Sequence, residues 1–234
     1  MAASRATRQR QPPLSDDEIS RRKRAAASAA AELLEDGMRV GLGTGSTVAH
    51  LLPAIAERAL KNLRCVATSP ATEQAARSLG MIVETLDEVA ELDIAIDGAD
   101  QIDPSGWLVK GGGGAHTREK IVASAARRFV VIASAEKVVT QLGPPVPLEL
   151  VRFGVRHTLR RLGDARLRGT AQSPDGGLIA DYLGPVGDPR ELSATLGATP
   201  GVVEHGLFAP ELVSLILIAG AGGVERRSGA KQDP

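Results

Sequence analysis

Hydrophobic positions first recur at helical spacing just after Ser15. Ser15 and Glu18 have the spacing of a capping box, and apolar side chains three or four residues apart continue until Gly37, which predicts an amphipathic helix between them. Residues 1–14 contain two prolines and no hydrophobic period. We therefore predict a disordered extension before the first helix.

After this helix, short apolar runs alternate with helix-like stretches. The runs predict strands at 39–42, 64–67, 81–83, 94–96 and 129–133. The stretches between them predict helices at 47–62, 71–79 and 118–126. Strands that alternate with helices are typical of βαβ units, so we predict an α/β fold with a doubly wound, mostly parallel (Rossmann-like) sheet. Ligands of such sheets bind beyond the carboxyl ends of the strands.

The alternation breaks at Gly143, where three prolines follow within four residues. From there the elements are shorter, and a turn at 173–177 between two strand-like runs indicates a hairpin. We predict a small inserted α+β (ferredoxin-like) domain over 144–209. The apolar run 213–219 predicts a strand that returns to the first sheet, so the α/β domain comprises 15–143 plus 210–224. The polar residues 225–234 are expected to form a disordered tail.

Composition excludes several classes of protein. The chain has 28 Lys+Arg and 28 Asp+Glu, and this zero net charge argues against a nucleic-acid partner. No apolar run approaches the ~20 residues that span a bilayer, so we expect no membrane partner. The single cysteine, Cys65, excludes an intrachain disulfide and favours a cytoplasmic protein. The four histidines lack the spacing of metal ligands, so no metal site is expected.

Two glycine-containing motifs lie at the predicted strand ends. Residues 41–47 read GLGTGST, where glycines, hydroxyls and the start of a helix suit a phosphate group. Neither the Walker nor the dinucleotide pattern fits, and a plain tight turn is the alternative. Residues 97–100 read DGAD, which places two carboxylates at one strand end. Such a pair suits an acid beside a base or a divalent metal, and a solvated turn is the alternative.

The most unusual stretch is Lys110 followed by four consecutive glycines. Glycines cost conformational entropy, so a close approach of backbone to ligand explains them better than packing does. Thr117 is expected to cap the next helix, with Glu119 in its first turn. Glu119 is a candidate general base if burial raises its pKa at least as much as the helix end lowers it. A hydrogen-bonded role is the simpler expectation for His116, and Lys137 is either an available cation or a surface lysine.

Together, these motifs resemble ribose-5-phosphate isomerases of the A type. The resemblance covers about 17–222 and rests on GLGTGST, DGAD and KGGGGAHTREK, supported by 132–137, 147–150, 200–203 and 206–208. It implies interconversion of D-ribose 5-phosphate and D-ribulose 5-phosphate in the pentose phosphate pathway, without metal or other cofactor. It also suggests a homodimer or homotetramer. The family commonly continues DGAD with Glu, whereas this chain has Gln101.

The resemblance also implies roles for individual residues. Glu119 matches the proton acceptor, Asp97 and Asp100 address the sugar hydroxyls and ring opening, and Lys110 stabilises charge on the substrate oxygens. The implied substrate-binding set is Thr44, Gly45, Ser46, Thr47, Asp97, Gly98, Ala99, Asp100, Lys110, Gly111, Gly112, Gly113, Lys137 and Lys23. Lys23 lies in the basic run 21–24, where an offset of one position would change the match and a solvated helix face is the alternative.

Related folds leave other functions to be weighed. Sugar-phosphate deaminases, coenzyme A transferases and effector domains of phosphosugar-responsive repressors share the expected architecture, so the fold alone does not fix the function. A repressor requires a DNA-reading module, for which the residues before the first helix are too few. A nucleotide-dependent enzyme is disfavoured by the imperfect glycine pattern.

Overall fold

The computed structural model describes residues 14–89 and 91–232. Apart from Leu14, the extension predicted over 1–14 lies outside the described residues. In the part of the chain that is described, no helix is long and apolar enough to cross a membrane.

The elements follow the predicted alternation, but the first two helices end six and five residues before the predicted positions, Gly37 and 62. The helices are α1 (Asp16–Ala31), α2 (Val48–Glu57), α3 (Pro70–Ser78), α4 (Leu86–Val89), α5 (His116–Ala125), α6 (Val155–Leu162) and α7 (Pro189–Gly197), with short 3-10 helices η1 (Ala135–Lys137) and η2 (Pro210–Leu212). The strands are β1 (Arg39–Leu42), β2 (Arg64–Ala67), β3 (Ile82–Val83), β4 (Leu92–Gly98), β5 (Gln101–Ile102), β6 (Leu108–Val109), β7 (Ala126–Ser134), β8 (Val146–Leu150), β9 (Ala165–Gln172), β10 (Leu178–Tyr182), β11 (Val202–His205), β12 (Leu207–Phe208), β13 (Leu215–Gly220) and β14 (Gly223–Ser228).

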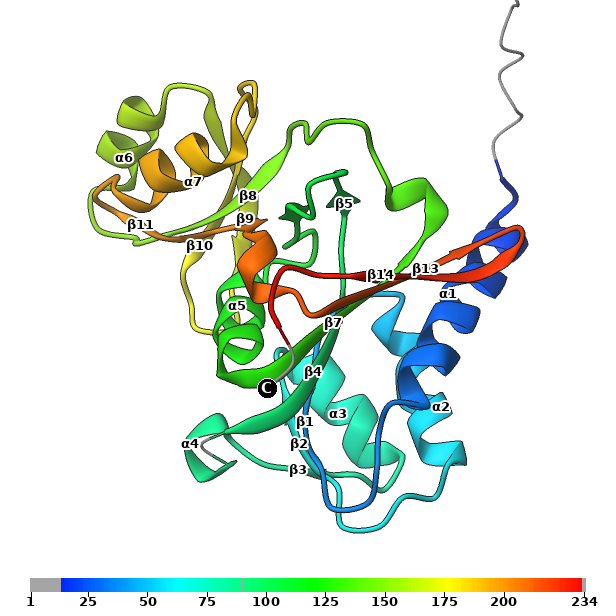
Figure 1. Ribbon diagram of the computed structural model, residues 1–234. Helices are drawn as coiled ribbons and strands as arrows, with labels where there is room; N and C mark the ends of the chain where they lie inside the picture. The colour runs from blue at the N-terminus through cyan, green and yellow to red at the C-terminus, as the bar shows by residue number, and fades with distance from the viewer. Residues whose placement is uncertain (1–13, 90, 233–234) are drawn as a thin grey trace, which may run out of the picture.

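A seven-stranded sheet forms the centre of the molecule, in the order β14-β13-β7-β4-β1-β2-β3 (Figure 1). All neighbouring pairs are parallel except β13 and β14. The carboxyl ends of β1, β4 and β7 therefore meet at one edge of the sheet, as the predicted parallel arrangement requires.

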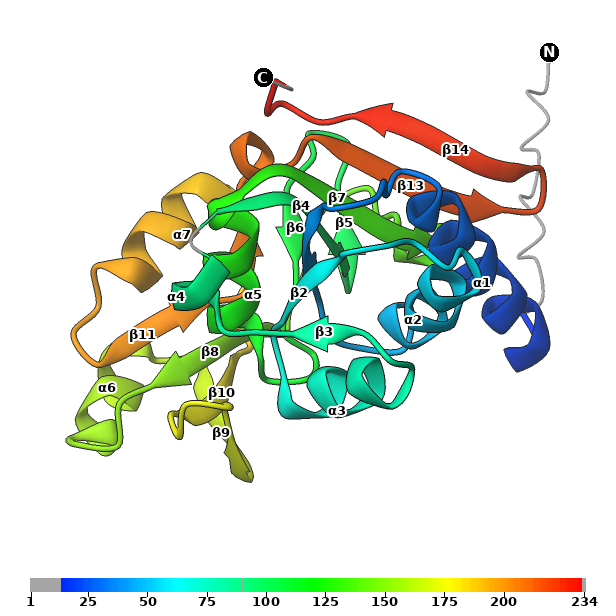
Figure 2. The ribbon, with the colours of Figure 1, turned by 90° about the horizontal axis from the view of Figure 1, so that it is seen from below.

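Helices cover both faces of this sheet, which confirms the doubly wound α/β fold. α1 and α2 lie together on one face and α5 lies on the other (Figure 2). Ser15 caps α1 by accepting a hydrogen bond from the Glu18 amide. The buried stripe of α1 consists of small side chains, Ala26, Ala27 and Ala30 among them, which lets the helix approach the sheet closely. Cys65 is buried in β2, within the strand predicted at 64–67.

The disordered tail predicted for 225–234 is wrong at 225–228, which belong to β14. β14 pairs along its whole length with the apolar strand β13, in antiparallel register. Four of its six residues are exposed because β14 is an edge strand, where charged side chains meet water. The polar sequence therefore gave no hydrophobic period to detect. Residues 233–234 lie outside the described residues.

A second, four-stranded sheet lies beside the first, in the order β11-β8-β10-β9 (Figure 1). Its strands and helices follow one another as β8-α6-β9-β10-α7-β11, and neighbouring strands are antiparallel. This is the split βαβ, ferredoxin-like arrangement. All of these elements fall within 144–209.

A third, small sheet joins β5, β6 and β12. Each of its strands has two residues, too few to show any hydrophobic period. β6 pairs with β12, and directly beyond it the Lys110 amide donates to the Gly206 carbonyl at 2.8 Å. The position of Lys110 therefore depends on the segment around Gly206, which leads from the second sheet back to the third.

Candidate active site

The turn after β1 lies directly against the end of β4. A Cβ atom on Gly43 would come 2.0 Å from the carboxyl carbon of Asp97, so only glycine fits there. The next amide, that of Thr44, donates to Asp97 Oδ1 at 3.1 Å. The Thr44 hydroxyl lies 2.7 Å from that of Thr68, so it is turned back toward β2. The turn and the DGAD motif thus form one structural unit.

Four consecutive amides in this turn are available to a ligand. Within the described residues, no acceptor takes a hydrogen bond from the N–H groups of 45–48, which open helix α2. Gly45 has a φ of +115°, a backbone conformation that other residues rarely adopt. Lys23 on α1 reaches the same turn and donates to Ser46 Oγ at 2.9 Å. Free amides at a helix start beside a cation suit an anionic group such as a phosphate.

Three charged side chains meet in the interior beside this turn. The ammonium Nζ of Lys110 lies 2.8 Å from Asp97 Oδ2 and 3.1 Å from Glu119 Oε2, and each of the three side chains is at most 4% exposed. Nζ also donates to the Gly98 carbonyl at 2.5 Å. The two carboxylate oxygens have ion-pair distances but no hydrogen bond of good geometry. Both oxygens are buried, so the Lys110 ammonium is the group that balances their charge.

Burial sets the protonation of this cluster. It raises the pKa of Glu119 to about 7, with a further rise from the Asp97 carboxylate and an opposing effect of Lys110. Burial also raises the pKa of Asp97, again against Lys110. Burial alone would lower the pKa of Lys110, but the two carboxylates raise it above the usual value. Glu119 is thus poised near neutral pH beside a permanent cation, which suits a general base.

The glycine loop closes the other side of the site. Gly111 and Gly114 have φ values of +100° and +76°, and the Gly112 amide donates to Asp100 Oδ2 at 2.9 Å. The amide of Gly112 is therefore occupied. The amides of Gly111 and Gly113 have no acceptor among the described residues and remain available to a ligand.

A single pocket gathers nearly all of the residues in the predicted set. It is lined by Thr44, Gly45, Ser46, Thr47, Gly98, Ala99, Asp100, Lys110, Gly111, Gly112, Gly113, Glu119 and Lys137. Asp97 is not part of the lining. It contacts two lining residues, through an ion pair with Lys110 and a hydrogen bond from the Thr44 amide. Lys23 is outside the lining but binds Ser46. In the described part of the chain, no group of three or more His, Cys, Asp or Glu is placed to hold a metal ion.

Helix α5 begins two residues earlier than predicted. His116 is its first residue, Ala115 is in the capping position, and Thr117 instead donates from its hydroxyl to Glu149 on β8 at 2.5 Å. The prediction that Thr117 caps the helix is therefore wrong, because its hydroxyl has a partner in the second sheet. His116 is fully buried, its Nε2 lies 3.3 Å from the Glu204 carbonyl, and burial lowers its pKa to about 4.

Gln101 does not line the pocket. Its side-chain amide makes two hydrogen bonds with the backbone of Gly143, donating to the carbonyl at 2.9 Å and accepting from the N–H at 2.8 Å. A carboxylate could accept from Gly143 but could not donate to it. Gln101 thus braces the segment that follows Lys137, and the departure from the family's usual Glu leaves the pocket lining unchanged.

We expect Gln101→Glu to lower stability. The variant loses the donated bond and places a carboxylate against the Gly143 carbonyl, at a cost of about 1–3 kcal/mol. Urea unfolding followed by circular dichroism measures the change. Gln172→Glu at the exposed end of β9 is a matched control, expected within about 0.5 kcal/mol of the original chain. Equal midpoints for the two variants would contradict the bracing role.

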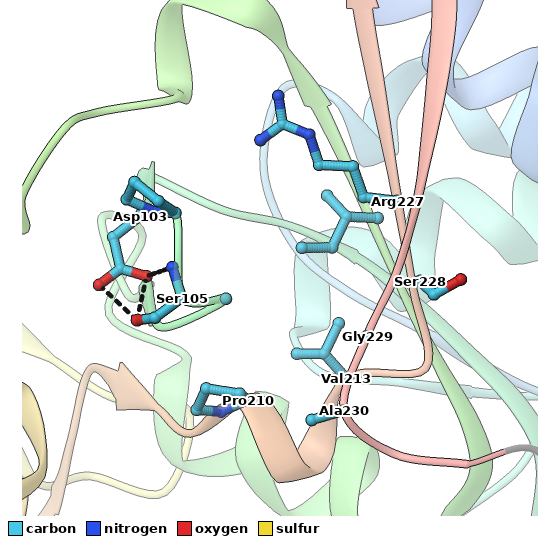
Figure 3. A pocket seen from close by; sticks show the side chains of 11 residues that line it. Asp103, Ser105, Pro210, Val213, Arg227, Ser228, Gly229 and Ala230 are labelled. Atoms are coloured by element: carbon cyan, nitrogen blue, oxygen red, sulfur yellow. Dashed lines mark hydrogen bonds between the residues drawn. The ribbon is translucent and has the colours of Figure 1, made fainter.

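Another pocket lies between the β5–β6 turn, η2 and β14 (Figure 3). Its one carboxylate, Asp103, is engaged by the Ser105 hydroxyl and amide and by the Trp107 amide. The Arg227 guanidinium is paired with Glu225. Asp103 and Arg227 therefore already have partners within the turn and the edge strand. The candidate catalytic groups lie in the pocket around Glu119.

A doubly wound sheet that sets an anion-binding turn beside a buried carboxylate of near-neutral pKa is typical of an enzyme that moves protons on a small phosphorylated substrate. The family model of ribose 5-phosphate isomerase A (phosphoriboisomerase A) matches residues 64–223. The chain belongs to this family.

Relatives and solved structures agree with this assignment. The chain is 47% identical over 212 residues to a ribose-5-phosphate isomerase A of Caulobacter vibrioides, covering 84% of this chain and 93% of the relative. One from Nitrobacter hamburgensis is 44% identical over 220 residues, covering 85% and 94%. The crystal structure of the Neisseria gonorrhoeae isomerase superposes with a TM-score of 0.86 at 32% identity, covering 91% of this chain and 98% of that one.

Proposed function

We propose that this protein catalyses the reversible interconversion of D-ribose 5-phosphate and D-ribulose 5-phosphate. The observation that carries the proposal is Glu119, a buried carboxylate with a pKa of about 7 that lines a pocket beside the Lys110 ammonium. Membership of the isomerase family supports the same conclusion.

An aldose–ketose exchange moves one proton between neighbouring carbons. Glu119 takes the proton from C2 of the open-chain aldose, which leaves an enediolate, and returns it to C1 to give the ketose. One carboxylate placed over both carbons serves both steps. Its near-neutral pKa lets it hold the proton between the steps and release it again.

Charge that develops on the substrate oxygens needs donors that are already in place. The Lys110 ammonium is fixed by Asp97 and the Gly98 carbonyl, so it needs no rearrangement to meet a negative oxygen. The free amides of Gly111 and Gly113 supply two further donors from the glycine loop. We assign the enediolate oxygens to this side of the pocket.

The phosphate binds at the opposite end, in the turn after β1. The four free amides of 45–48, the hydroxyls of Ser46 and Thr47 and the start of helix α2 form the cradle. Lys23 and Lys137 supply positive charge, the first through its contact with Ser46 and the second from the pocket wall.

Ring opening precedes isomerisation, because the sugar phosphate is mostly cyclic in solution. Asp100 is exposed at the pocket rim with one oxygen held by the Gly112 amide, so the other is free to accept a hydroxyl proton. Asp97 lies outside the pocket lining and is paired with Lys110, so its part in ring opening is to hold that ammonium in place for the substrate oxygens.

A related isomerase has been solved in complex with phospho-erythronic acid, at 31% identity and a TM-score of 0.85 over 90% of this chain. This compound carries a carboxylate and a phosphate at opposite ends. A pocket with donors near Glu119 and an amide cradle at 45–48 is complementary to both groups, which supports the proposed orientation of the substrate.

Incubation with ribose 5-phosphate in heavy water tests the proposal. We expect ketose to form with deuterium at C1, since Glu119 exchanges its proton with solvent between the two transfers. Proton NMR of the product measures the label, and a sample without protein is the control. Tight binding without turnover would identify a phosphosugar-binding protein instead and would refute the isomerase function.

From the family resemblance we further propose that the enzyme acts in the cytoplasm, in the pentose phosphate pathway, as a homodimer or homotetramer.

A further inference from the structure

The glycine loop is held from outside by a side chain of the second sheet. Arg168 on β9 donates from Nη1 to the carbonyls of Gly111 and Gly112, at 3.2 and 2.9 Å. Its remaining donors, Nε and Nη2, bind the two oxygens of Asp181 on β10, each at 2.6 Å. A guanidinium has the planar set of donors that such a double contact needs, and a lysine does not.

The planarity of the peptide bond transmits this contact to the pocket. In a trans peptide the carbonyl and the following N–H point in opposite directions. Because Arg168 holds the Gly112 carbonyl, the Gly113 N–H points away from Arg168. Gly113 lines the pocket whereas Arg168 does not, and the Gly113 N–H has no acceptor among the described residues.

The neighbouring peptide is held from both sides. The Gly111 carbonyl faces Arg168, while the Gly112 N–H donates to Asp100. The peptide between Gly112 and Gly113 has only the Arg168 contact. Glycine has no Cβ to restrict its rotation, so removal of Arg168 leaves this peptide free to turn.

The surroundings of Arg168 fit a built support rather than a chance surface contact. The Arg168 and Asp181 side chains are 24% and 19% exposed. Ile179, two residues before Asp181 on the same face of β10, packs under the loop, where a Cβ on Gly114 would meet it at 3.2 Å. On another side the His116 ring lies against Gly111, where a Cβ would come 2.7 Å from Nδ1.

We propose that Arg168, held by Asp181, is a positioning residue that directs the Gly113 N–H toward the oxygens of the reacting substrate. This inference rests on the proposed function, because it concerns charge that develops on the enediolate. It gives the second sheet a part in the reaction although it contributes none of the pocket residues.

Arg168→Met tests the proposal because methionine keeps the length of the side chain and removes every donor. We expect kcat to fall at least ~10-fold, somewhat less than the loss of a whole oxyanion donor. KM should change less than about twofold, since the contact matters when charge develops. Arg166→Met is the matched control: Arg166 lies on the same strand and is exposed, and its side chain makes no hydrogen bond or ion pair within the described residues.

Binding measurements separate positioning from general damage. By calorimetry, Arg168→Met should bind phospho-erythronic acid more weakly by about the factor lost in kcat, while inorganic phosphate binds as in the original chain. Asp181→Asn should act through Arg168, so the double variant should be no slower than Arg168→Met within about twofold. Should Arg168→Met fail to fold, Arg168→Lys replaces it under the same criteria, because one ammonium cannot bridge Asp181 and both carbonyls.

The proposal is overturned if kcat of the Arg168 variant stays within twofold of the Arg166 control. Equal weakening of phospho-erythronic acid and phosphate binding, or multiplied losses in the double variant, would overturn it as well. If the original chain binds phospho-erythronic acid but does not isomerise ribose 5-phosphate, the proposed function fails, and the calorimetric comparison alone decides the role of Arg168.

Discussion

Glu119→Gln should lower kcat by at least ~10²-fold, the lower end of what a positioned base contributes. The amide is nearly the same size as the carboxylate but cannot take the proton from C2. Phosphate binding at the other end of the pocket should stay unchanged, so KM should move little. A coupled assay of ribulose 5-phosphate formation measures the loss, and near-normal turnover would contradict the assignment of Glu119 as the base.

The pH dependence identifies the same group independently. Because burial raises the pKa of Glu119 to about 7, kcat/KM of the original enzyme should decline as pH falls below about 7 and the carboxylate takes up a proton. The residual kcat/KM of Glu119→Gln should not show this decline at low pH, which we call the acid limb of the profile. Glu32→Gln is the matched control, since Glu32 is exposed and its side chain has no partner within the described residues.

Lys110→Met is expected to impair both catalysis and folding. Loss of a preorganised cation opposite the enediolate should lower kcat by ~10²–10³-fold. The variant also leaves two buried carboxylates without their shared cation, which costs about 3–5 kcal/mol of stability at pH 8. At lower pH the carboxylates take up protons, and the deficit in stability should shrink.

The pH profile of kcat/KM for Lys110→Met should shift to higher pH. Lys110 opposes the rise in the pKa of Glu119. Without Lys110 the pKa of Glu119 rises further, so the acid limb of the kcat/KM profile shifts to higher pH. Lys61→Met, at an exposed lysine, controls for the change in net charge. An unshifted limb, or full stability at pH 8, would show that Lys110 does not act as the counter-ion of Glu119.

Hydrophobic periodicity was enough to predict the parallel strands of the central sheet and the long helices that cover it. Buried parallel strands such as β4 and β7 contain short apolar runs, 94–96 and 129–133, which stand out from amphipathic helices. β14 was missed because an edge strand tolerates charge, and β5, β6 and β12 because two residues show no period. Those elements are defined by their partners in space rather than by their own side chains.

The candidate site was predictable because its residues lie in compact motifs at strand ends. DGAD places Asp97 and Asp100 beside the turn after β1, and the glycine loop brings Lys110 and Glu119 to the same edge. Arg168 and the brace of Gln101 on Gly143 gave no such signal. Their partners are distant in sequence and are mostly backbone groups, which any sequence contains.

The pairing of β6 with β12 determines when the site can be completed during synthesis. The chain that holds Lys110 from behind, at Gly206, leaves the ribosome roughly one hundred residues after Lys110 itself. At about 5–20 residues per second, the nascent protein spends on the order of 5–20 s with its catalytic lysine lacking that support. The backbone of Lys110 therefore gains this support only late in translation.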